Sequence, residues 1–484
     1  MLDKKLTRRD LLKLAGATAG SAILSACTPA EPADPEVVEV EVTREVAGEA
    51  EEIVVTATPP AAAPGRKVLR WWDNYNGEHP IGQTVQNVVF EQFKQENPGW
   101  DVEFTFVTNT EVVPKLITSR MAGEPPDLWG NFAGRGSTAH AGYCLPLQDF
   151  VKDIGQWDDM IDGYKRICTV GDDLIGYPDL CGTKMYIYRK DFFEEAGLDP
   201  DNFPTNWDDL LDALIKTTQY DASGAITRSG WNLGGTADWE QIAVMGWQNG
   251  GSEFDQADLL AGKCTVAEPE FAEAFSWMLD LKRVHNVCPL EGMTLPPGTS
   301  ALVEGFMAVD LQGPWAIPGM RLRDPEGAER LGIGAPIARK DGGERLGLAN
   351  ANHVISVYAD SDVLDAALAL LEVYSRPENL AATCTSIDPE GKNPQYFLSA
   401  LQSVSPNLQW VQEEPLIGES AYLEYSGSGV DVAYDHIGYR EMAINIWNPY
   451  MEMALFGMRS DQDALETMAA KADGITGRIL STGA

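Results

Sequence analysis

Three successive segments, KVLRWWD at residues 67–73, TVQNVVFEQFKQ at residues 84–95 and VEFTFV at residues 102–107, decide the fold class of this 484-residue chain. The first and third are short and rich in apolar and aromatic residues, which predicts buried strands, whereas the second repeats apolar residues at the spacing of one helix face. The alternation continues with a predicted helix over residues 112–122 and a short strand at Trp129. Strands that alternate with helices predict an α/β fold whose sheet contains parallel pairs covered on both faces.

The body of the chain, from Lys67 to Ala484, is long enough for two ordinary domains with substantial cores. It contains no internal repeat. Further helices are predicted at residues 207–218, 268–284, 362–374, 439–456 and 461–472.

The first 26 residues form a predicted export signal. Arg8 and Arg9 precede an apolar, small-residue run that is too short to span a membrane, and the run ends in LSAC at residues 24–27. The paired arginines resemble a Tat signal, which exports folded proteins, although Sec export stays open. LSAC resembles a bacterial lipobox, which predicts that Cys27 is lipidated and anchors the exported protein to the outer face of the cytoplasmic membrane.

Residues 27–66 form a predicted flexible tether between this anchor and the body. The segment is composed largely of Pro, Ala, Glu, Val and Thr and has no aromatic residue to start a core. Proline and like charges keep such a segment extended, so it holds a globular body away from the bilayer.

The chain is strongly acidic, with 36 Lys and Arg against 73 Asp and Glu and a formal net charge of −37. Nucleic-acid binding depends on a basic surface that displaces counterions from phosphates. A nucleic acid is therefore excluded as the expected partner, and the charge is interpreted as a solvated surface that resists aggregation.

Six cysteines remain after Cys27, and the sequence does not choose among their possible pairings. Cys168 and Cys181 flank a predicted hairpin at residues 169–177. Cys264 and Cys288 flank the helix that begins near Pro269, so each pair is a candidate disulfide. Six buried thiols are the alternative. The five histidines are scattered, so no metal site is expected, and no cofactor either. The six cysteines are Cys144, Cys168, Cys181, Cys264, Cys288 and Cys384.

Ordered landmarks along the body carry a resemblance to a known family. They are GEPPD at 123–127, LPL at 145–147, GYP at 176–178, YIYRKDFFEEAGL at 186–198, PTNWDDL at 204–210, NGG at 249–251, FMAV at 306–309 and GPWA at 313–316. In this order they resemble family 1 of the extracellular solute-binding proteins, and GPWA is similar to the corresponding segment of maltose-binding protein. The resemblance implies a two-lobed periplasmic-binding-protein-like fold with a ligand cleft between the lobes. It also implies a monomer that captures a small solute, most simply a sugar, and delivers it to the permease subunits of an ABC importer.

The resemblance also places the lobes along the chain. It implies crossings between them near residues 178–183, 334–337 and 387–396. Each lobe is then assembled from two segments, with 67–180 and 336–390 in the first lobe and 181–335 and 391–484 in the second.

The end of the first predicted strand carries candidate ligand contacts. Trp72, Asp73 and Tyr75 lie where an open α/β sheet presents its carboxyl edge to a ligand. An aromatic face suits the C–H face of a sugar ring, and carboxylates or amides suit its hydroxyls. Because neighbouring strand residues face opposite ways, one of Trp71 and Trp72 is expected in the core. Capping or core roles remain the alternative for the three candidates.

Other candidate contacts follow from the resemblance. Trp315 matches the tryptophan that stacks on the ligand in the family. A helix N-cap is the alternative for Asp238, and a packed interior position is the alternative for Trp239. The aromatic residue that closes the site in maltose-binding protein is not matched in register, with Tyr439 and Arg440 nearest, which does not favour a maltodextrin. The remaining candidates are Asn131 and Arg135 from the first lobe, and Trp231, Asp238, Trp239, Glu240, Asn350 and Asn352.

Two other functions use the same sequence features. A sensor that presents its ligand to a membrane receptor needs the same fold as an importer's binding protein. A glycan-active enzyme needs two carboxyl groups across a sugar, and acidic pairs such as Asp172–Asp173 are present. Adjacent carboxylates in turns are usually solvated, and the chain has no nucleophile elbow, phosphate loop or metal motif, so a binding protein and not an enzyme is expected.

Overall fold

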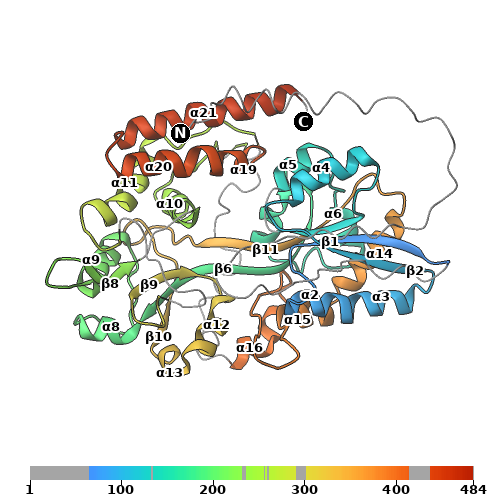
Figure 1. Cartoon of the computed structure of the whole chain (residues 1–484), viewed down its shortest axis with the longest axis horizontal. Helices are drawn as coiled ribbons and strands as arrows, with labels where there is room; N and C mark the ends of the chain where they lie inside the picture. Colours follow the sequence, from blue (N-terminus) through green and yellow to red (C-terminus); the bar gives the residue numbers. More distant parts are fainter. Residues whose placement is uncertain are drawn as a thin grey trace, which may run out of the picture. The chain divides into compact units, whose positions relative to one another are not determined.

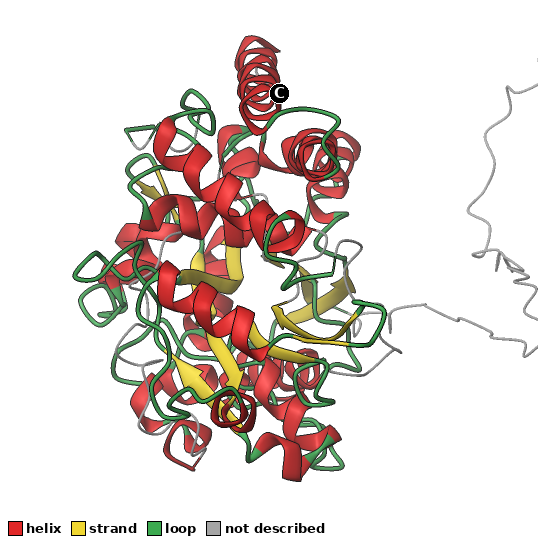
Figure 2. Ribbon diagram, turned by 90° about the vertical axis from the view of Figure 1, so that its left-hand side faces the viewer, coloured by secondary structure: helices red, strands yellow, loops and turns green. Residues whose placement is uncertain are grey.

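The structure, a computed structural model, describes residues 65–482 with gaps at 132–134, 232–235, 256, 259–260, 290–300 and 414–435 (Figure 1, Figure 2). The predicted signal, nearly all of the tether and Cys27 lie outside the described residues. None of the described helices combines the length and apolar character that crossing a membrane requires.

Three parallel strands form one end of the main sheet. β1 (Lys67–Asp73) lies between β2 (Trp100–Phe106) and β3 (Leu128–Asn131). The strand at Lys67–Asp73 and helix α4 (Val112–Ala122) are confirmed with the predicted bounds. The predicted second strand is also confirmed, although it begins two residues earlier.

The helix after β1 starts one turn earlier than predicted. It consists of α2 (Pro80–Thr84), a π-helical turn (Val85–Phe90) and α3 (Glu91–Glu96). The side chain of His79 accepts a hydrogen bond from a backbone amide of the first turn, and Pro80 occupies the first helical position, where its missing N–H costs nothing. This cap starts the helix although its first turn contains a glycine.

Two long antiparallel strands occupy the middle of the sheet, whose order is β2-β1-β3-β11-β6-β9-β8-β7. The first part of β6 (Tyr177–Arg189) pairs with β11 (Leu348–Val357), and its second part pairs with β9 (Met307–Gln312) and β10 (Leu331–Gly334). A single strand, β6, therefore belongs to both halves of the sheet. The first half contains β2, β1, β3 and β11, and the second half contains β9, β10, β8 and β7. Figure 1 shows β6 and β11 side by side between two groups of helices.

Two of the predicted crossings between the lobes lie within a strand or directly after one. Residues 178–183, the first predicted crossing, lie within β6. Residues 334–337, the second, follow the end of β10, and the chain runs back along the first half of β6 through β11.

The third predicted crossing, at residues 387–396, precedes a segment that packs on the first half of the body. Leu398 bridges to Cys181 in β6, and Leu401 bridges to Met160. These pairings associate residues 398–401 with the first half, although the predicted boundary assigns them to the second lobe.

The second half of the sheet is covered by helices from distant parts of the chain. α9 (Trp207–Thr217) and α11 (Pro269–Arg283) confirm two predicted helices within two residues. The C-terminal helices confirm two more, and α21 continues ten residues beyond its predicted end. Figure 1 shows α20 and α21 beside α11, and α19 lies against α21. The C-terminal elements are α19 (Tyr439–Met442), a π-helical turn (Ala443–Trp447), α20 (Asn448–Leu455) and α21 (Asp461–Thr482).

Other described elements complete the fold, among them α14, which confirms the predicted helix at 362–374, and β4 and β5, which form the predicted hairpin. They are α5 (Arg135–His140), α6 (Gln148–Asp153), α7 (Asp162–Ile167), β4 (Thr169–Val170), β5 (Asp173–Leu174), α8 (Lys190–Glu195), β7 (Gln219–Tyr220), β8 (Ile226–Trp231), α10 (Thr236–Gln248), α12 (Ala316–Arg323), α13 (Pro325–Ala328), α14 (Leu364–Tyr374), α15 (Pro377–Cys384), a 3₁₀ turn (Ser405–Asn407) and α16 (Gln409–Glu413).

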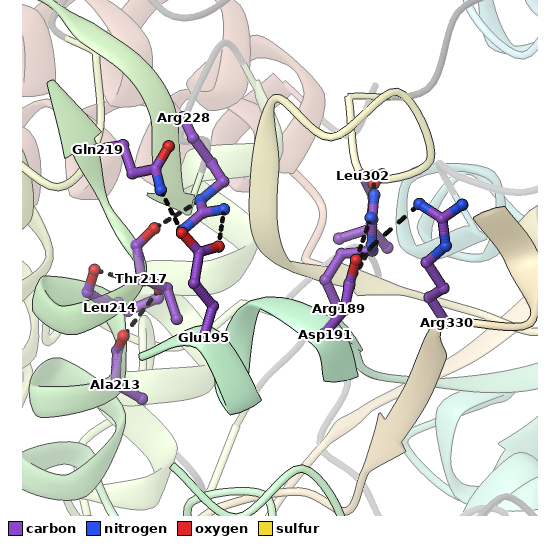
Figure 3. A network of polar contacts seen from close by, with 10 residues as sticks. All are labelled: Arg189, Asp191, Glu195, Ala213, Leu214, Thr217, Gln219, Arg228, Leu302 and Arg330. Atoms are coloured by element: carbon purple, nitrogen blue, oxygen red, sulfur yellow. Dashed lines mark hydrogen bonds and ion pairs between the residues drawn. The ribbon is translucent and has the colours of Figure 1, made fainter. Parts of the chain in front are cut away.

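Helix α8 is tied to the second half of the sheet by two arginines (Figure 3). Arg189 pairs with Asp191 and donates to the carbonyl of Leu302, while Arg228 pairs with Glu195. Both guanidinium carbons lie over the ring of Phe192, at 4.1 and 3.9 Å from its centroid. Such buried charges are stabilised by their partners and by the aromatic face.

The six cysteines of the body are buried thiols, so the structure corresponds to the alternative without disulfides. The Cys384 thiol donates to the backbone carbonyl of Asp179, at 3.7 Å, and burial raises the pKa of the Cys264 thiol to about 12. Among the described residues no group of His, Cys, Asp and Glu is arranged to hold a metal ion.

Candidate functional site

The carboxyl ends of β1 and β3 meet at one edge of the sheet. Asp73, the last residue of β1, lies opposite Gly130 of β3, and Gly130 lies opposite Ile355 of β11. Asn131 is the next residue after Gly130 on β3, and His353 lies two residues before Ile355 on β11. The edge of the sheet that is predicted to face a ligand thus contains residues from β1, β3 and β11.

Asp73 is almost fully buried, and both of its carboxylate oxygens are engaged within the protein. Its Oδ2 accepts from Nε1 of Trp71 at 2.9 Å, and its Oδ1 accepts from the backbone N of Tyr75 at 2.8 Å. Oδ1 also lies 3.3 Å from Nε2 of His353. These contacts resemble the capping alternative more closely than a carboxylate open to a ligand.

Tyr75 is half-buried and lies between two imidazole rings. Its ring centroid is 4.6 Å from that of His79 and 5.4 Å from that of His353. Burial, followed by the charges of Asp179 and Asp73, raises the pKa of Tyr75, so its phenol stays neutral and able to donate a hydrogen bond.

The two adjacent tryptophans of β1 face opposite ways, as alternation requires. Trp71 is fully buried and stacks on Tyr374, with centroids 5.7 Å apart. Trp72 is half-buried and packs against a smaller cluster that includes Trp129. Trp71 is thus the core residue of the pair.

Trp315 lies on two glycines. A Cβ atom on Gly182 would lie 2.8 Å from its ring, and a Cβ on Gly313 would lie 2.1 Å from it. The ring also stacks on Phe397, with centroids 5.8 Å apart and planes 18° from parallel. Because Gly182 belongs to β6 and lies opposite Asn350 of β11, Trp315 is held over the two central strands, and it is only partly buried.

The second half contributes a charged pair close to this point. Lys184 follows Gly182 by two residues on β6, so both face the same side of the strand. Its ammonium pairs with a carboxylate oxygen of Glu240 at 2.5 Å, and the two side chains are 18% and 16% exposed. Glu240 is thus a half-buried carboxylate from α10 with a cation beside it, and its predicted contact with a ligand stays a prediction.

Two of the predicted aromatic contacts lie inside the hydrophobic core that packs on the second half of the sheet. Trp239 is 2% exposed and stacks on Trp447, with centroids 4.5 Å apart and planes 3° from parallel. Trp231 is fully buried and meets the edge of Tyr186. The packed alternative fits Trp239, and the same description fits Trp231.

Three asparagines belong to or follow the strands at this edge: Asn74 follows the end of β1, Asn131 ends β3 and Asn352 lies in β11. Asn131 is 1% exposed. The Oδ1 atoms of Asn74 and Asn352 are buried and accept no hydrogen bond from any described residue. Buried carbonyl oxygens are rarely left without a donor, so these two are suited to accept from a ligand hydroxyl or a water.

Three candidates have side chains outside the described part of the structure. Only their backbone positions are given: Arg135 begins α5, Asp238 lies in the first turn of α10 and Asn350 lies in β11. Sequence reasoning missed Asn74, Lys184 and His353. Asn74 follows Asp73 directly and His353 follows Asn352, so extending each predicted cluster by one residue finds two of the three.

Comparison with known proteins adds three findings. The sequence profile described as "Bacterial extracellular solute-binding protein" matches residues 89–391, well over half of the chain. The sn-glycerol-3-phosphate-binding periplasmic protein UgpB of Escherichia coli K12 is 27% identical over 201 residues, which are 39% of this chain and 44% of UgpB. The chain therefore spans less than half the length of this curated relative.

Solved structures share the fold across most of the chain. The sugar-binding protein MalE of Xanthomonas citri has a TM-score of 0.68 at 18% identity, covering 85% of this chain and 98% of that protein. A solute-binding protein of Thermotoga lettingae bound to α-D-tagatose has a TM-score of 0.67 at 19% identity, covering 85% and 100%. The cyclic α-maltosyl-1,6-maltose binding protein of Arthrobacter globiformis has a TM-score of 0.66 at 21% identity, covering 85% and 99%.

These likenesses confirm the predicted two-lobed α/β fold of periplasmic binding proteins. The matched family consists of solute-binding proteins and not of enzymes, which agrees with the prediction. The profile match over residues 89–391 shows that the chain belongs to the bacterial extracellular solute-binding protein family.

Proposed function

We propose that this solute-binding protein captures a sugar or oligosaccharide outside the membrane and delivers it to an ABC importer. The observation that carries the proposal is the placement of Trp315. Its ring is only partly buried and is held by Gly182, Gly313 and Phe397 over the two central strands. A flat, rigid apolar surface that stays accessible is suited to stack on a sugar ring.

Polar groups near the sheet edge complement the ring. Asn74 and Asn352 offer buried carbonyl oxygens that accept from no residue in the described part of the chain, and Tyr75 offers a neutral phenol. A sugar presents many hydroxyl donors, and a wrong solute that left such acceptors unpaired would lose about 1–3 kcal/mol for each. Two similar solved structures support a carbohydrate as the solute: one is bound to α-D-tagatose, and the other is named as a binding protein for cyclic α-maltosyl-1,6-maltose.

Export and anchoring complete the proposal. The LSAC sequence supports lipidation of Cys27, and the tether at 27–66 supports a body held near the outer face of the cytoplasmic membrane by one lipid anchor. Arg8 and Arg9 support export through the Tat route. We expect Cys27→Ala to abolish incorporation of a labelled fatty acid, and equal labelling of the variant and the natural chain would contradict this.

The division of the lobes by residue remains a proposal. Residues 67–180 with 336–390, and 181–335 with 391–484, are the lobes expected from the resemblance. The bridges of Leu398 and Leu401 to first-half segments favour moving the last boundary beyond these residues. Delivery as a monomer to permease subunits is the corresponding proposal for partners.

The ligand is tested by calorimetry and thermal shift with a defined panel. The panel holds D-tagatose, maltose, mannobiose, mannotriose and sn-glycerol-3-phosphate, each of which is named for one of the related proteins. A sugar present at 100 times its dissociation constant is expected to stabilise the fold by about 2.7 kcal/mol. Binding of glycerol 3-phosphate and of none of the sugars would overturn the carbohydrate proposal.

Trp315→Ala then tests the observation that carries the proposal. We expect affinity for the bound sugar to fall by about 1–3 kcal/mol, because truncating a central aromatic platform removes much of the binding energy. Trp100→Ala, on the outer strand β2, is the matched control. A folded Trp315→Ala variant with unchanged affinity would exclude Trp315 as a contact.

A further inference from the structure

The imidazole of His353 lies between two carboxylates in the interior. Its Nδ1 is 3.0 and 2.9 Å from the two oxygens of Asp179 on β6, and its Nε2 is 3.3 Å from Oδ1 of Asp73 at the end of β1. All three side chains are at most 1% exposed. One ring therefore contacts two strands that are not neighbours in the sheet.

The neighbouring residues restrict the imidazole of His353 to one position. A Cβ atom on Gly130 of β3 would lie 2.1 Å from Nε2 of His353, so only glycine permits the approach. Asp179 is itself held by Tyr374, whose hydroxyl donates to Oδ2 at 2.6 Å. The imidazole is thus fixed by β1, β3, β6 and α14 together.

Charge explains why this arrangement is stable. Two buried carboxylates close together repel each other and lose hydration, unless a cation lies between them. Burial alone would lower the pKa of His353, but the charges of Asp179 and Asp73 outweigh it and raise the pKa to about 10. The imidazole is therefore a cation at neutral pH, with Nδ1 within hydrogen-bond distance of Asp179 and Nε2 facing Asp73 as an ion pair at 3.3 Å.

We propose that His353 is a positioning residue of the solute site, which holds the Asp73 carboxylate against the backbone of Tyr75 and so fixes the Tyr75 ring toward the ligand. The proposal rests on the proposed function, because Tyr75 is taken there as a sugar contact. Asp73 then acts through the turn that it caps and not by touching the sugar, unlike the sequence-based expectation.

The contacts around the turn support this role. Oδ1 of Asp73 is the atom shared by the backbone N of Tyr75 and by His353 Nε2, so a shift of the imidazole moves the acceptor of the turn. The ring of His353 also lies 5.4 Å from that of Tyr75. Removing His353 leaves two buried carboxylates uncompensated at the base of the turn.

The first experiment needs no ligand. With histidine side chains labelled in ¹³C, the wild-type His353 signal is expected to show no titration step between about pH 5.5 and 8.5, a window that includes the ordinary histidine pKa of about 6.5. The groups that face the imidazole are Asp73, Asp179 and Tyr75, and Asp73→Asn is expected to lower its titration midpoint by at least about one unit. A wild-type midpoint near 6.5 would overturn the proposal.

The second experiment separates positioning from general stability. In His353→Gln, the Tyr75 amide is expected to exchange its hydrogen at least about tenfold faster, while amides of β8 and α21 keep their wild-type rates. His285→Gln, half-exposed after the end of α11, is the control and should change neither. Equal acceleration at all sites would show a merely structural role. If His353→Gln does not fold, the Asp73→Asn titration decides the question.

The third experiment measures the solute site with maltose, mannotriose and D-tagatose. A sugar that binds the wild type is expected to bind His353→Gln about tenfold more weakly and His285→Gln unchanged. Local acceleration at Tyr75 with unchanged affinity would overturn the positioning role. If no sugar of the panel binds the wild type, the carbohydrate function itself fails, and His353 is then judged on the titration and exchange results alone.

Discussion

At the scale of single residues, the tryptophans show how far the sequence predicts a site. Alternation along β1 correctly indicated that one of Trp71 and Trp72 is in the core, because the side-chain period of a strand is a local property. The burial of Trp239 depends on its stacking with Trp447, more than 200 residues away in the sequence. No local pattern in the sequence indicates such a distant contact. The sequence therefore left two roles open for Trp239, a ligand contact and a packed interior position.

The glycine at position 182 gives a residue-scale prediction. In Gly182→Ala the new methyl group would meet the Trp315 ring at 2.8 Å and Pro314 at 3.2 Å, so the ring must shift. We expect a loss of about 1–3 kcal/mol in unfolding free energy, as overpacking typically costs, with weaker sugar binding. Denaturant titration and calorimetry measure the two effects.

Gly319→Ala is the matched control for this change. Gly319 lies in α12, and a Cβ there meets no atom within 4 Å. The substitution should leave sugar binding unchanged and stabilise the helix by up to about 1 kcal/mol. Equal destabilisation by both alanines would contradict the packing of Trp315 on Gly182.

Glu253 gives a pH-dependent prediction. It is 1% exposed, with Nε1 of Trp247 3.3 Å from one carboxylate oxygen, and burial raises its pKa to about 7. A raised carboxyl pKa means that the folded state binds the proton more tightly. The stability it contributes is complete below about pH 4.5 and is lost as pH rises through about 7.

Glu253→Gln tests this sign. The variant should gain stability relative to the wild type as pH rises from about 4.5 to 8, by on the order of 3 kcal/mol across the range. Comparing the two proteins at each pH cancels the opposite contribution of His436, whose pKa burial lowers to about 4. A constant difference at all pH values would show that Glu253 is not protonated in the fold.

At the scale of elements, the predictions succeeded where a periodic segment ends at a strong local signal. α4 ends at Gly123, which adopts a left-handed conformation with φ 78°, and its predicted bounds are confirmed. The first turn of α2 was missed because its cap, His79, is not among the usual N-cap residues. The course of the chain after β10 depends on pairing between distant strands, which no segment reveals by itself.

The cap of α9 gives an element-scale prediction. The Asn206 side chain accepts from the backbone N of Asp209 at 2.9 Å and donates to the carboxylates of Asp209 and Asp341. Asn206→Ala should lower the unfolding free energy by about 1–2 kcal/mol, because the cap and a tie to a distant loop are both lost. Asn407→Ala, on an exposed turn, is the control and should change stability by under about 0.5 kcal/mol.

At the scale of the whole molecule, ordered sequence landmarks predicted the fold better than any physical pattern did. Eight weak signals in a fixed order are specific together, and the similar solved structures confirm the two-lobed fold that they implied. Individual site residues were less predictable, because Asp73 and Trp231 lie where a contact was expected and yet are enclosed by their neighbours.

Lobe closure is the prediction at this scale. A sugar that contacts both lobes favours the closed arrangement, so the radius of gyration should decrease on saturation with a sugar from the panel. Small-angle scattering of the free and saturated protein measures this, with Trp315→Ala at the same sugar concentration as control. An unchanged radius at saturation, verified by calorimetry, would contradict closure.

The position of β11 in the sheet has a consequence for how the chain matures. β3 pairs on one side with β1, close in the sequence, but its other side pairs with β11, more than 200 residues later. While the ribosome is still making the intervening segments, that flank of β3 has no partner, and closing so long a loop slows folding. The nascent N-terminal strands therefore need shielding until Leu348–Val357 is synthesised, and an export route that accepts only finished proteins must wait for the same strand.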